Sequence, residues 1–162
     1  MTAGNLKPHG LKVALICPQI APNTGNIARL CVASGAELHL VRPLGFVLSD
    51  RQLKRSAMDY WDRLKLTIHD DVNAFLAAST VGQRWCFSTK GERSIWDTPF
   101  EESDWLIFGN ESHGLPDAMM TQFAASLIRI PQQPGERCLN LSTSVGIGVY
   151  EAIRQCSTRS NR

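Results

Sequence analysis

The sequence lacks the common signatures of metal, phosphate and nucleophile sites. Its five cysteines include no C-x-x-C pair, so neither a zinc site nor a redox motif is expected. It has no G-x-x-x-x-G-K-[ST] loop, no G-x-G-x-x-G after the first apolar run and no G-x-S-x-G turn. Gly146 and Gly148 lack the third glycine and lie within a helical pattern, which favours close packing instead.

The sequence also lacks any apolar run of the ~18–20 residues that cross a membrane. Residues 1–10 contain no apolar signal core, so a flexible leader is expected there. The cysteines are odd in number and widely spaced, which is typical of reduced thiols in a cytoplasmic protein. We therefore expect a cytoplasmic protein with no membrane and no metal partner.

The composition of the 162 residues is that of a single globular domain. Hydrophobic residues make up 43% of the chain and charged residues 20%, which is enough to bury a full core. The net charge of +2 permits a nucleic-acid partner but does not indicate one, because a dedicated basic binder would carry a larger excess.

The first forty residues predict a strand–helix–strand unit. Residues 11–17 form a short apolar run closed by Pro18, and residues 37–41 form a second such run. Between them we expect a loop over residues 18–25 and a helix over residues 26–34 that stops at Gly35. A βαβ unit of this length implies a parallel sheet.

The rest of the chain continues the alternation. The expected helices cover residues 49–57, 71–78 (begun by Asp70 or Asp71), 115–124 and 144–155, and the expected strands cover residues 64–68, 84–88, 104–108 and 126–130. We therefore predict one α/β domain over residues 11–157. It has a mostly parallel sheet with helices on both faces, and a basic tail follows at residues 158–162.

Polar loops follow several of the predicted strands. They cover residues 18–25, 88–91, 109–114 and 131–142. In parallel sheets ligands bind outside the carboxyl ends of the strands, so these loops predict a composite binding site. Their polar residues are Asn23, Asn26, Arg29, Asn110, Glu111, Ser112, His113, Asn140, Ser142, Thr143 and Ser144. The alternative is that the Asn and Ser side chains only form turns and helix caps.

Three of these segments resemble the three motifs of the SPOUT RNA 2′-O-ribose methyltransferases. The segments are NTGNIAR at residues 23–29, FGNESHGL at residues 108–115, and Ile130-Pro131 with LNLSTSV at residues 139–145. We expect no appended RNA-binding domain, which is similar to the minimal TrmL branch. That branch methylates the ribose of the wobble nucleotide, a cytidine or uridine at tRNA position 34, in certain leucine tRNAs.

The resemblance implies a C-terminal deep trefoil knot, a homodimer and S-adenosyl-L-methionine as cofactor, with S-adenosyl-L-homocysteine as product. By residue-for-residue carry-over, the cofactor would be contacted by Phe87, Gly109, Ile130 and Cys138 and bordered by Leu139, Asn140 and Ser142. Cys138 stands where family members often have a serine or another small residue. Asn110 replaces a proline common in the TrmL branch but is usual in related SPOUT enzymes.

Arg29 is the first catalytic candidate implied by the resemblance. A protonated guanidinium suits electrostatic stabilisation of a developing alkoxide, although a structural ion pair is the alternative. Glu111 is expected either to hold Arg29 or the ribose, or to cap the helix that follows. Asn26 and Ser142 would position the substrate or Arg29. Tyr150 either reaches across a dimer interface or is a core aromatic.

Four basic residues are candidates for binding tRNA phosphates. Arg51, Lys54 and Arg55 share one face of a predicted helix, and Arg154 lies on the last helix. A solvated helix face is the alternative. For the whole chain we also consider a methyltransferase acting on another tRNA position or on rRNA, and a non-catalytic RNA-binding protein with the same fold.

Overall fold

A parallel β-sheet of seven strands forms the centre of the molecule. The computed structural model describes residues 5–49, 55 and 58–159, and all strand pairs in it are parallel. The strand order is β3-β2-β1-β6-β4-β7-β5. The strands are β1 (Lys12–Ile16), β2 (Glu37–Val41), β3 (Leu66–His69), β4 (Arg84–Phe87), β5 (Arg93–Ser94), β6 (Trp105–Phe108) and β7 (Leu127–Arg129).

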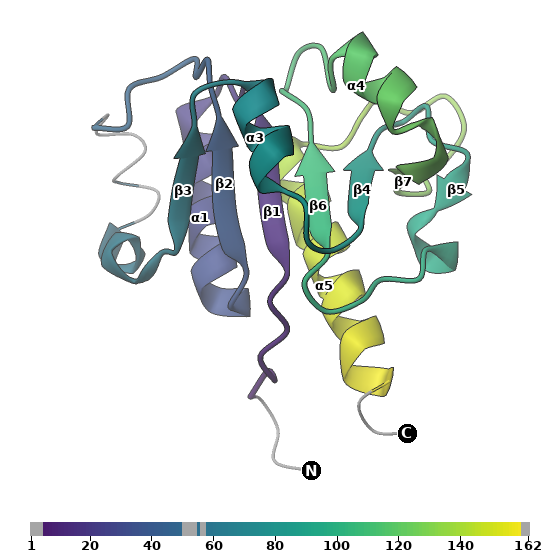
Figure 1. The fold of residues 1–162 in the computed structure, drawn as a ribbon, viewed down its shortest axis with the longest axis horizontal. Coiled ribbons are helices and arrows are strands. Elements are labelled where there is room, and N and C mark those ends of the chain that lie inside the picture. Colours follow the sequence, from purple (N-terminus) through teal and green to yellow (C-terminus); the bar gives the residue numbers. More distant parts are fainter. Residues whose placement is uncertain (1–4, 50–54, 56–57, 160–162) are drawn as a thin grey trace.

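Helices cover both faces of this sheet. Figure 1 shows α1 (Ala21–Ser34) and α5 (Leu141–Arg159) behind the sheet, with α3 (Val72–Ala78) and α4 (Asp117–Gln122) in front of it. Short 3₁₀ segments lie at η1 (Met58–Arg63), η2 (Ile95–Asp97) and η3 (Ala124–Ser126). The predicted α/β class, the parallel sheet and the coverage of both faces are confirmed.

The alternation of side chains along the strands divides the core into two layers. Val13 and Leu15 of β1 are buried on the α1–α5 side, and Ala14 and Ile16 are buried on the other side with Phe75 of α3. Successive strand residues point to opposite faces, so a strand covered on both sides must be apolar throughout. This explains why the central strands are short continuous apolar runs.

Helix α1 begins five residues before the predicted start. The predicted loop over residues 18–25 is confirmed only for residues 18–20, because the helix starts at Ala21. Pro22 falls in its first turn, where the missing N–H costs nothing and the fixed φ suits a helix. The predicted end is right, since Gly35 adopts φ 82° and donates its N–H to the Cys31 carbonyl at 2.9 Å.

Other element boundaries shift by a few residues. Helix α5 starts at 141 rather than 144 and runs to 159, so it includes the first two residues of the expected tail. Helix α4 is shorter than the predicted 115–124, and β3 lies at 66–69 rather than 64–68. The sequence did not indicate β5 or η2. Most of the predicted helix over 49–57 lies outside the described residues.

Buried histidines make contacts between segments that are distant in the sequence. His9, in the expected leader, is buried, and its ring nitrogens contact the Ser34 carbonyl at 2.8 Å and the Leu11 N–H at 3.0 Å. His39 of β2 contacts the ring of His69 at the end of β3, with 2.9 Å between Nδ1 and Nε2. His9 therefore joins the segment before β1 to the end of α1.

Candidate active site

A cavity of about 490 Å³ opens at the carboxyl ends of the central strands. It lies where β4, β6 and β7 end, at the edge toward which the strand arrows of Figure 1 point. Its lining comprises Ile20, Asn23, Phe87, Ser88, Thr89, Lys90, Phe108, Gly109, Asn110, Glu111, Ser112, His113, Gly114, Leu115, Met120, Ile130, Gln132, Cys138, Leu139, Asn140, Leu141 and Ser144. The cavity thus combines all of the polar loops that the sequence placed after strands.

The floor of the cavity is aromatic. The rings of Phe87 and Phe108, the last residues of β4 and β6, are stacked with centroids 4.2 Å apart. Helix α5 passes directly beneath them at Gly148, where a Cβ atom would lie 2.7 Å from Cζ of Phe87. Such a contact is too short for any side chain, so Gly148 sets how close the helix comes. Ile130 and Leu115 add apolar wall.

Glu111 joins two of the three motif segments. Its Oε2 accepts the Gln19 N–H at 2.8 Å, and its Oε1 accepts the Ile20 N–H at 3.0 Å and the Asn23 amide at 3.4 Å. A carboxylate at a helix N-terminus satisfies unpaired N–H groups and interacts well with the helix dipole. Glu111 therefore caps α1, and the expectation that it caps the helix following it is wrong.

Asn140 adds the third motif segment to the same network. Its Nδ2 donates to Oδ1 of Asn23 at 3.1 Å, and its Oδ1 accepts the Ser142 N–H at 2.9 Å and the Ser142 hydroxyl at 2.7 Å. Asn140 is thus the N-terminal cap of α5. Residues 23, 111, 140 and 142 form one continuous hydrogen-bonded chain at the cavity rim.

The loop after β6 is folded back on itself. Asn110 and Gly114 form an isolated antiparallel bridge, and Oδ1 of Asn110 accepts the N–H groups of Ser112 at 3.1 Å and His113 at 2.7 Å. At Gly109 a Cβ atom would lie 1.9 Å from the carbonyl carbon of Gly114. Only glycine fits at 109, which keeps the backbone of this loop against the cavity.

Arg29 and Asn26 lie outside the cavity, on the exposed side of α1. The guanidinium of Arg29 stacks over the ring of Tyr60, with Cζ 5.1 Å from its centroid. Among the described contacts of Glu111 none involves Arg29, so the expectation that Glu111 holds Arg29 is wrong in this structure. Tyr60 is an aromatic partner that the sequence did not assign to the site.

Tyr150 and Arg154 lie on the outward face of α5. Tyr150 is 47% exposed, so it is not the core aromatic that was the alternative. Arg154 pairs with Glu151 at 2.8 Å, and its hydrogen bond lowers the pKa of the Glu151 carboxyl. Arg55 is exposed, whereas Arg51 and Lys54 lie outside the described residues.

All predicted cofactor residues except Ser142 line the cavity. Ser142 lies at its rim through Asn140. Lys90 and Gln132 lie in predicted loops but were not singled out as site residues, and Met120 was not predicted at all. The signal for Lys90 was its place in the loop directly after a buried strand, whereas Met120 comes from a helix and could not be located without the fold.

The family model of the SpoU rRNA Methylase family matches residues 10–150. The chain belongs to the SpoU methylase family. It is 43% identical over 146 residues to the tRNA (cytidine(34)-2′-O)-methyltransferase of Burkholderia pseudomallei, a match that covers 88% of this chain and 94% of that enzyme. The predicted kinship with the tRNA methyltransferases, and the prediction of an enzyme, are confirmed.

Solved structures agree with this placement. A structure described as giving insights into the 2-OH methylation of C/U34 on tRNA matches with a TM-score of 0.89 and 43% identity, and the match covers 96% of this chain and 100% of that one. An AdoMet-bound rRNA methyltransferase from Sinorhizobium meliloti matches with a TM-score of 0.82 and 25% identity, over 93% of this chain and 58% of that one.

Within the described part of the chain, no helix is long and apolar enough to cross a membrane. The same residues contain no group of three or more His, Cys, Asp or Glu side chains placed to hold a metal ion. No disulfide joins any two of the five cysteines, and burial raises the pKa of the Cys31 and Cys86 thiols to about 12.

Proposed function

We propose that the protein uses S-adenosyl-L-methionine to methylate the ribose 2′-hydroxyl of the wobble nucleotide, C or U at position 34, in leucine tRNAs. One observation carries the proposal. Hydrogen bonds among Asn23, Glu111 and Asn140 join all three motif segments at the rim of a single cavity. The relatives named as tRNA (cytidine(34)-2′-O)-methyltransferases support the substrate. A tRNA substrate also supports the cytoplasmic location expected from the sequence.

The cavity suits the proposed cofactor. Its volume of about 490 Å³ is in the range of small-molecule sites, and its stacked Phe87 and Phe108 offer an apolar bed for an adenosine group. Gly109, Ile130, Cys138 and Leu139 line the same space. When bound, S-adenosyl-L-methionine supplies an activated methyl group with a good leaving group, and S-adenosyl-L-homocysteine is the product. The protein's part is alignment and charge stabilisation.

Arg29 is the proposed catalytic residue. Its exposed guanidinium stabilises negative charge that develops on the ribose 2′-oxygen, a role that needs no change of its protonation state. The ring of Tyr60 beneath it holds the side chain without neutralising its charge. Asn26, one turn earlier on α1, and Ser142, at the cavity rim, position the ribose. Glu111 acts indirectly by capping the helix that carries Arg29.

The tRNA is held mainly through its phosphates. Arg51, Lys54, Arg55 and Arg154 are the proposed contacts, because phosphate contacts fix position while base contacts carry sequence information. Arg154 already pairs with Glu151, so it would exchange one anionic partner for another.

A homodimer would complete the site. Tyr150 and Ile147 are exposed on α5, which packs against α1, the helix that carries Arg29. A twofold contact over these helices would bring Tyr150 to the partner subunit's site.

The proposal also includes a trefoil knot near the C-terminus. Strand β7 lies between β4 and β5, both of which belong to the strand and loop of residues 84–104. The chain then leaves β7 for α5, which packs behind β6 (Figure 1). This order supports threading of the last segment through the loop.

The test combines activity and binding. Total tRNA from a strain lacking the protein is methylated with the purified enzyme, and the modified nucleosides are identified by mass spectrometry. We expect 2′-O-methylated C or U at position 34 of leucine tRNAs. The Arg29→Ala variant should lose methylation by at least about a hundredfold, in line with loss of a charge-stabilising group, and should keep its affinity for S-adenosyl-L-homocysteine in calorimetry. Near-normal turnover by Arg29→Ala would refute the catalytic assignment, and methylation only at another nucleotide would refute the substrate.

A further inference from the structure

The turn after β4 is fixed tightly at the cavity edge. Ser88 donates its N–H to the Ile128 carbonyl of β7 at 2.9 Å, and its hydroxyl accepts the Lys90 N–H at 3.2 Å. Gly91 donates its N–H to the Ser88 carbonyl at 3.1 Å. These three bonds hold the backbone of residues 88–91 in one conformation against β7.

Gly91 locks this turn in place. A Cβ atom at Gly91 would lie 2.7 Å from the carbonyl carbon of Ile128, so the backbone of the turn touches that of β7. Thr89 and Lys90, the two residues before it, line the cavity. Packing against β7 therefore fixes the backbone of Lys90. Its side chain is exposed and extends from the wall of the cavity.

The described cavity lining contains one lysine without an ion-pair partner and one glutamate whose oxygens already accept hydrogen bonds. Lys90 is the one lysine or arginine among the lining residues, and within the described part of the chain its ammonium has no ion-pair partner. Glu111 is the one carboxylate among the described lining residues. Its oxygens already accept two backbone N–H groups and the Asn23 amide. The described lining thus offers one unpaired cation, Lys90, and one carboxylate that already accepts three hydrogen bonds.

We propose that Lys90 binds the carboxylate of the cofactor's methionine moiety. This inference rests on the proposed function, in which S-adenosyl-L-methionine occupies the cavity. The adenosine part has no negative charge and suits the aromatic floor, so the carboxylate is the group that requires a cation. A lysine ammonium on a fixed backbone supplies a charge-assisted hydrogen bond, which is stronger than a neutral one.

Two ligands separate this role from a general effect on the cavity. S-adenosyl-L-homocysteine carries the amino-acid carboxylate, and 5′-methylthioadenosine has the same adenosine and sulfur but no amino acid. In isothermal titration calorimetry with the full chain, Lys90→Met should bind S-adenosyl-L-homocysteine about tenfold or more weakly than the unmodified protein. Its affinity for 5′-methylthioadenosine should stay within about twofold.

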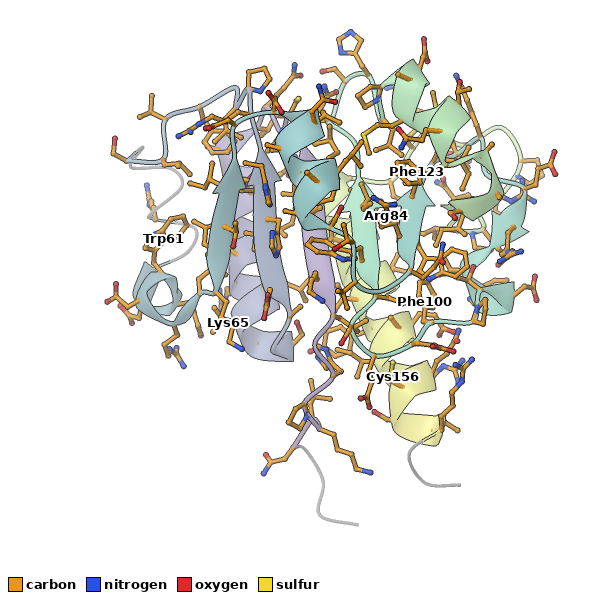
Figure 2. All side chains as sticks on the ribbon, viewed as in Figure 1. Trp61, Lys65, Arg84, Phe100, Phe123 and Cys156 are labelled. Atoms are coloured by element: carbon orange, nitrogen blue, oxygen red, sulfur yellow. The ribbon has the colours of Figure 1, made fainter. Side chains whose placement is uncertain are left out.

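Two further variants serve as controls. Lys90→Arg keeps the charge and should recover most of the affinity for S-adenosyl-L-homocysteine. Lys65→Met removes an exposed lysine at the opposite end of the sheet, labelled in Figure 2, and should change neither affinity. Cooperative thermal unfolding of each variant shows that it is folded.

The possible outcomes distinguish the role of Lys90 from the proposed cofactor on which it depends. If the unmodified protein binds neither ligand, the proposed cofactor itself is wrong. If it binds both and Lys90→Met loses affinity for both equally, or for neither, the carboxylate role is overturned. Weaker tRNA binding by Lys90→Met with unchanged affinity for S-adenosyl-L-homocysteine would assign the lysine to a phosphate instead, and would equally overturn it.

Discussion

His39 is a buried base in the middle of an aromatic cluster. Its ring contacts His69 at 2.9 Å and meets the edge of Trp105 with centroids 4.6 Å apart, and its Nε2 has no hydrogen-bond partner in the structure. Burial, the nearby His69 and the charge of Lys12 lower the pKa of His39 from 6.5 to about 4. Glu37, 3.8 Å away, is too distant and too exposed to compensate.

This residue makes stability fall in mild acid. As the pH drops, the unfolded chain takes up a proton near pH 6.5, whereas folded His39 does so only near pH 4. Protonation therefore favours the unfolded state, and the free energy of unfolding should drop by about 1–2 kcal/mol between about pH 7 and about pH 5. Urea denaturation across this range measures the slope.

A matched pair of variants isolates the cause. His39→Gln should flatten the dependence of the unfolding free energy on pH, even if it lowers stability at every pH. His113→Gln, in an exposed loop, should leave the slope unchanged. An equal slope in the unmodified protein and in His39→Gln would rule out His39 as its source.

At the scale of elements, α5 carries a matched pair of glycines. A Cβ at Gly148 would collide with the Phe87 ring at 2.7–2.8 Å and approach Phe108 at 3.3 Å, whereas a Cβ at Gly146 would meet only Leu30 at 3.9 Å. Gly148→Ala should therefore push Phe87 toward the cavity. We expect about tenfold or greater loss of S-adenosyl-L-homocysteine affinity in calorimetry, and about 1–3 kcal/mol less stability.

Gly146→Ala is the control for helix propensity. It should keep ligand affinity and gain up to about 1 kcal/mol in stability, because alanine favours the helix and the space is open. If both variants lost affinity alike, the close contact at Gly148 would not be what shapes the cavity.

The positions of most central strands follow from the sequence, whereas the start of the first helix does not. The apolar runs predicted β1, β2, β4 and β6 within one or two residues, because strands covered on both faces are mostly apolar. The start of α1 was missed since its cap, Glu111, lies some ninety residues away. The start of α5 has a signal in the sequence, because Asn140 is a residue type that commonly caps a helix N-terminus.

For the site, sequence located the loops but not their contacts. The resemblance named Phe87, Gly109 and Cys138 as cofactor contacts, and all three line the cavity. They could not show that Arg29 stacks on Tyr60, because η1 packs against α1 only in the folded molecule. Edge strand β5 has two residues, too few for any pattern, and exists only through its pairing with β7.

At the scale of the whole molecule, the assembly state is the main expectation. Tyr150 and Ile147 are 47% and 38% exposed on one side of α5. We expect the protein to sediment at twice the mass of the chain. Tyr150→Glu should shift it toward the monomer in analytical ultracentrifugation, because a buried unpaired charge opposes association.

Val81→Glu provides the control, since Val81 is 71% exposed and lies in the loop before β4, away from α5. This variant should sediment like the unmodified protein. If the unmodified protein is monomeric at micromolar concentration, the proposed dimer is excluded.

The position of β1 in the sheet bears on how the chain folds during synthesis. Strand β1 pairs with β2 on one side and with β6 on the other. A nascent chain that ends before residue 105 has β1 with one edge open, and it also lacks the carboxylate of Glu111 for the first helix. The centre of the sheet is completed only after about two thirds of the chain has left the ribosome. Strand β1 and helix α1, which are synthesised first, therefore remain without some of their native contacts for most of synthesis.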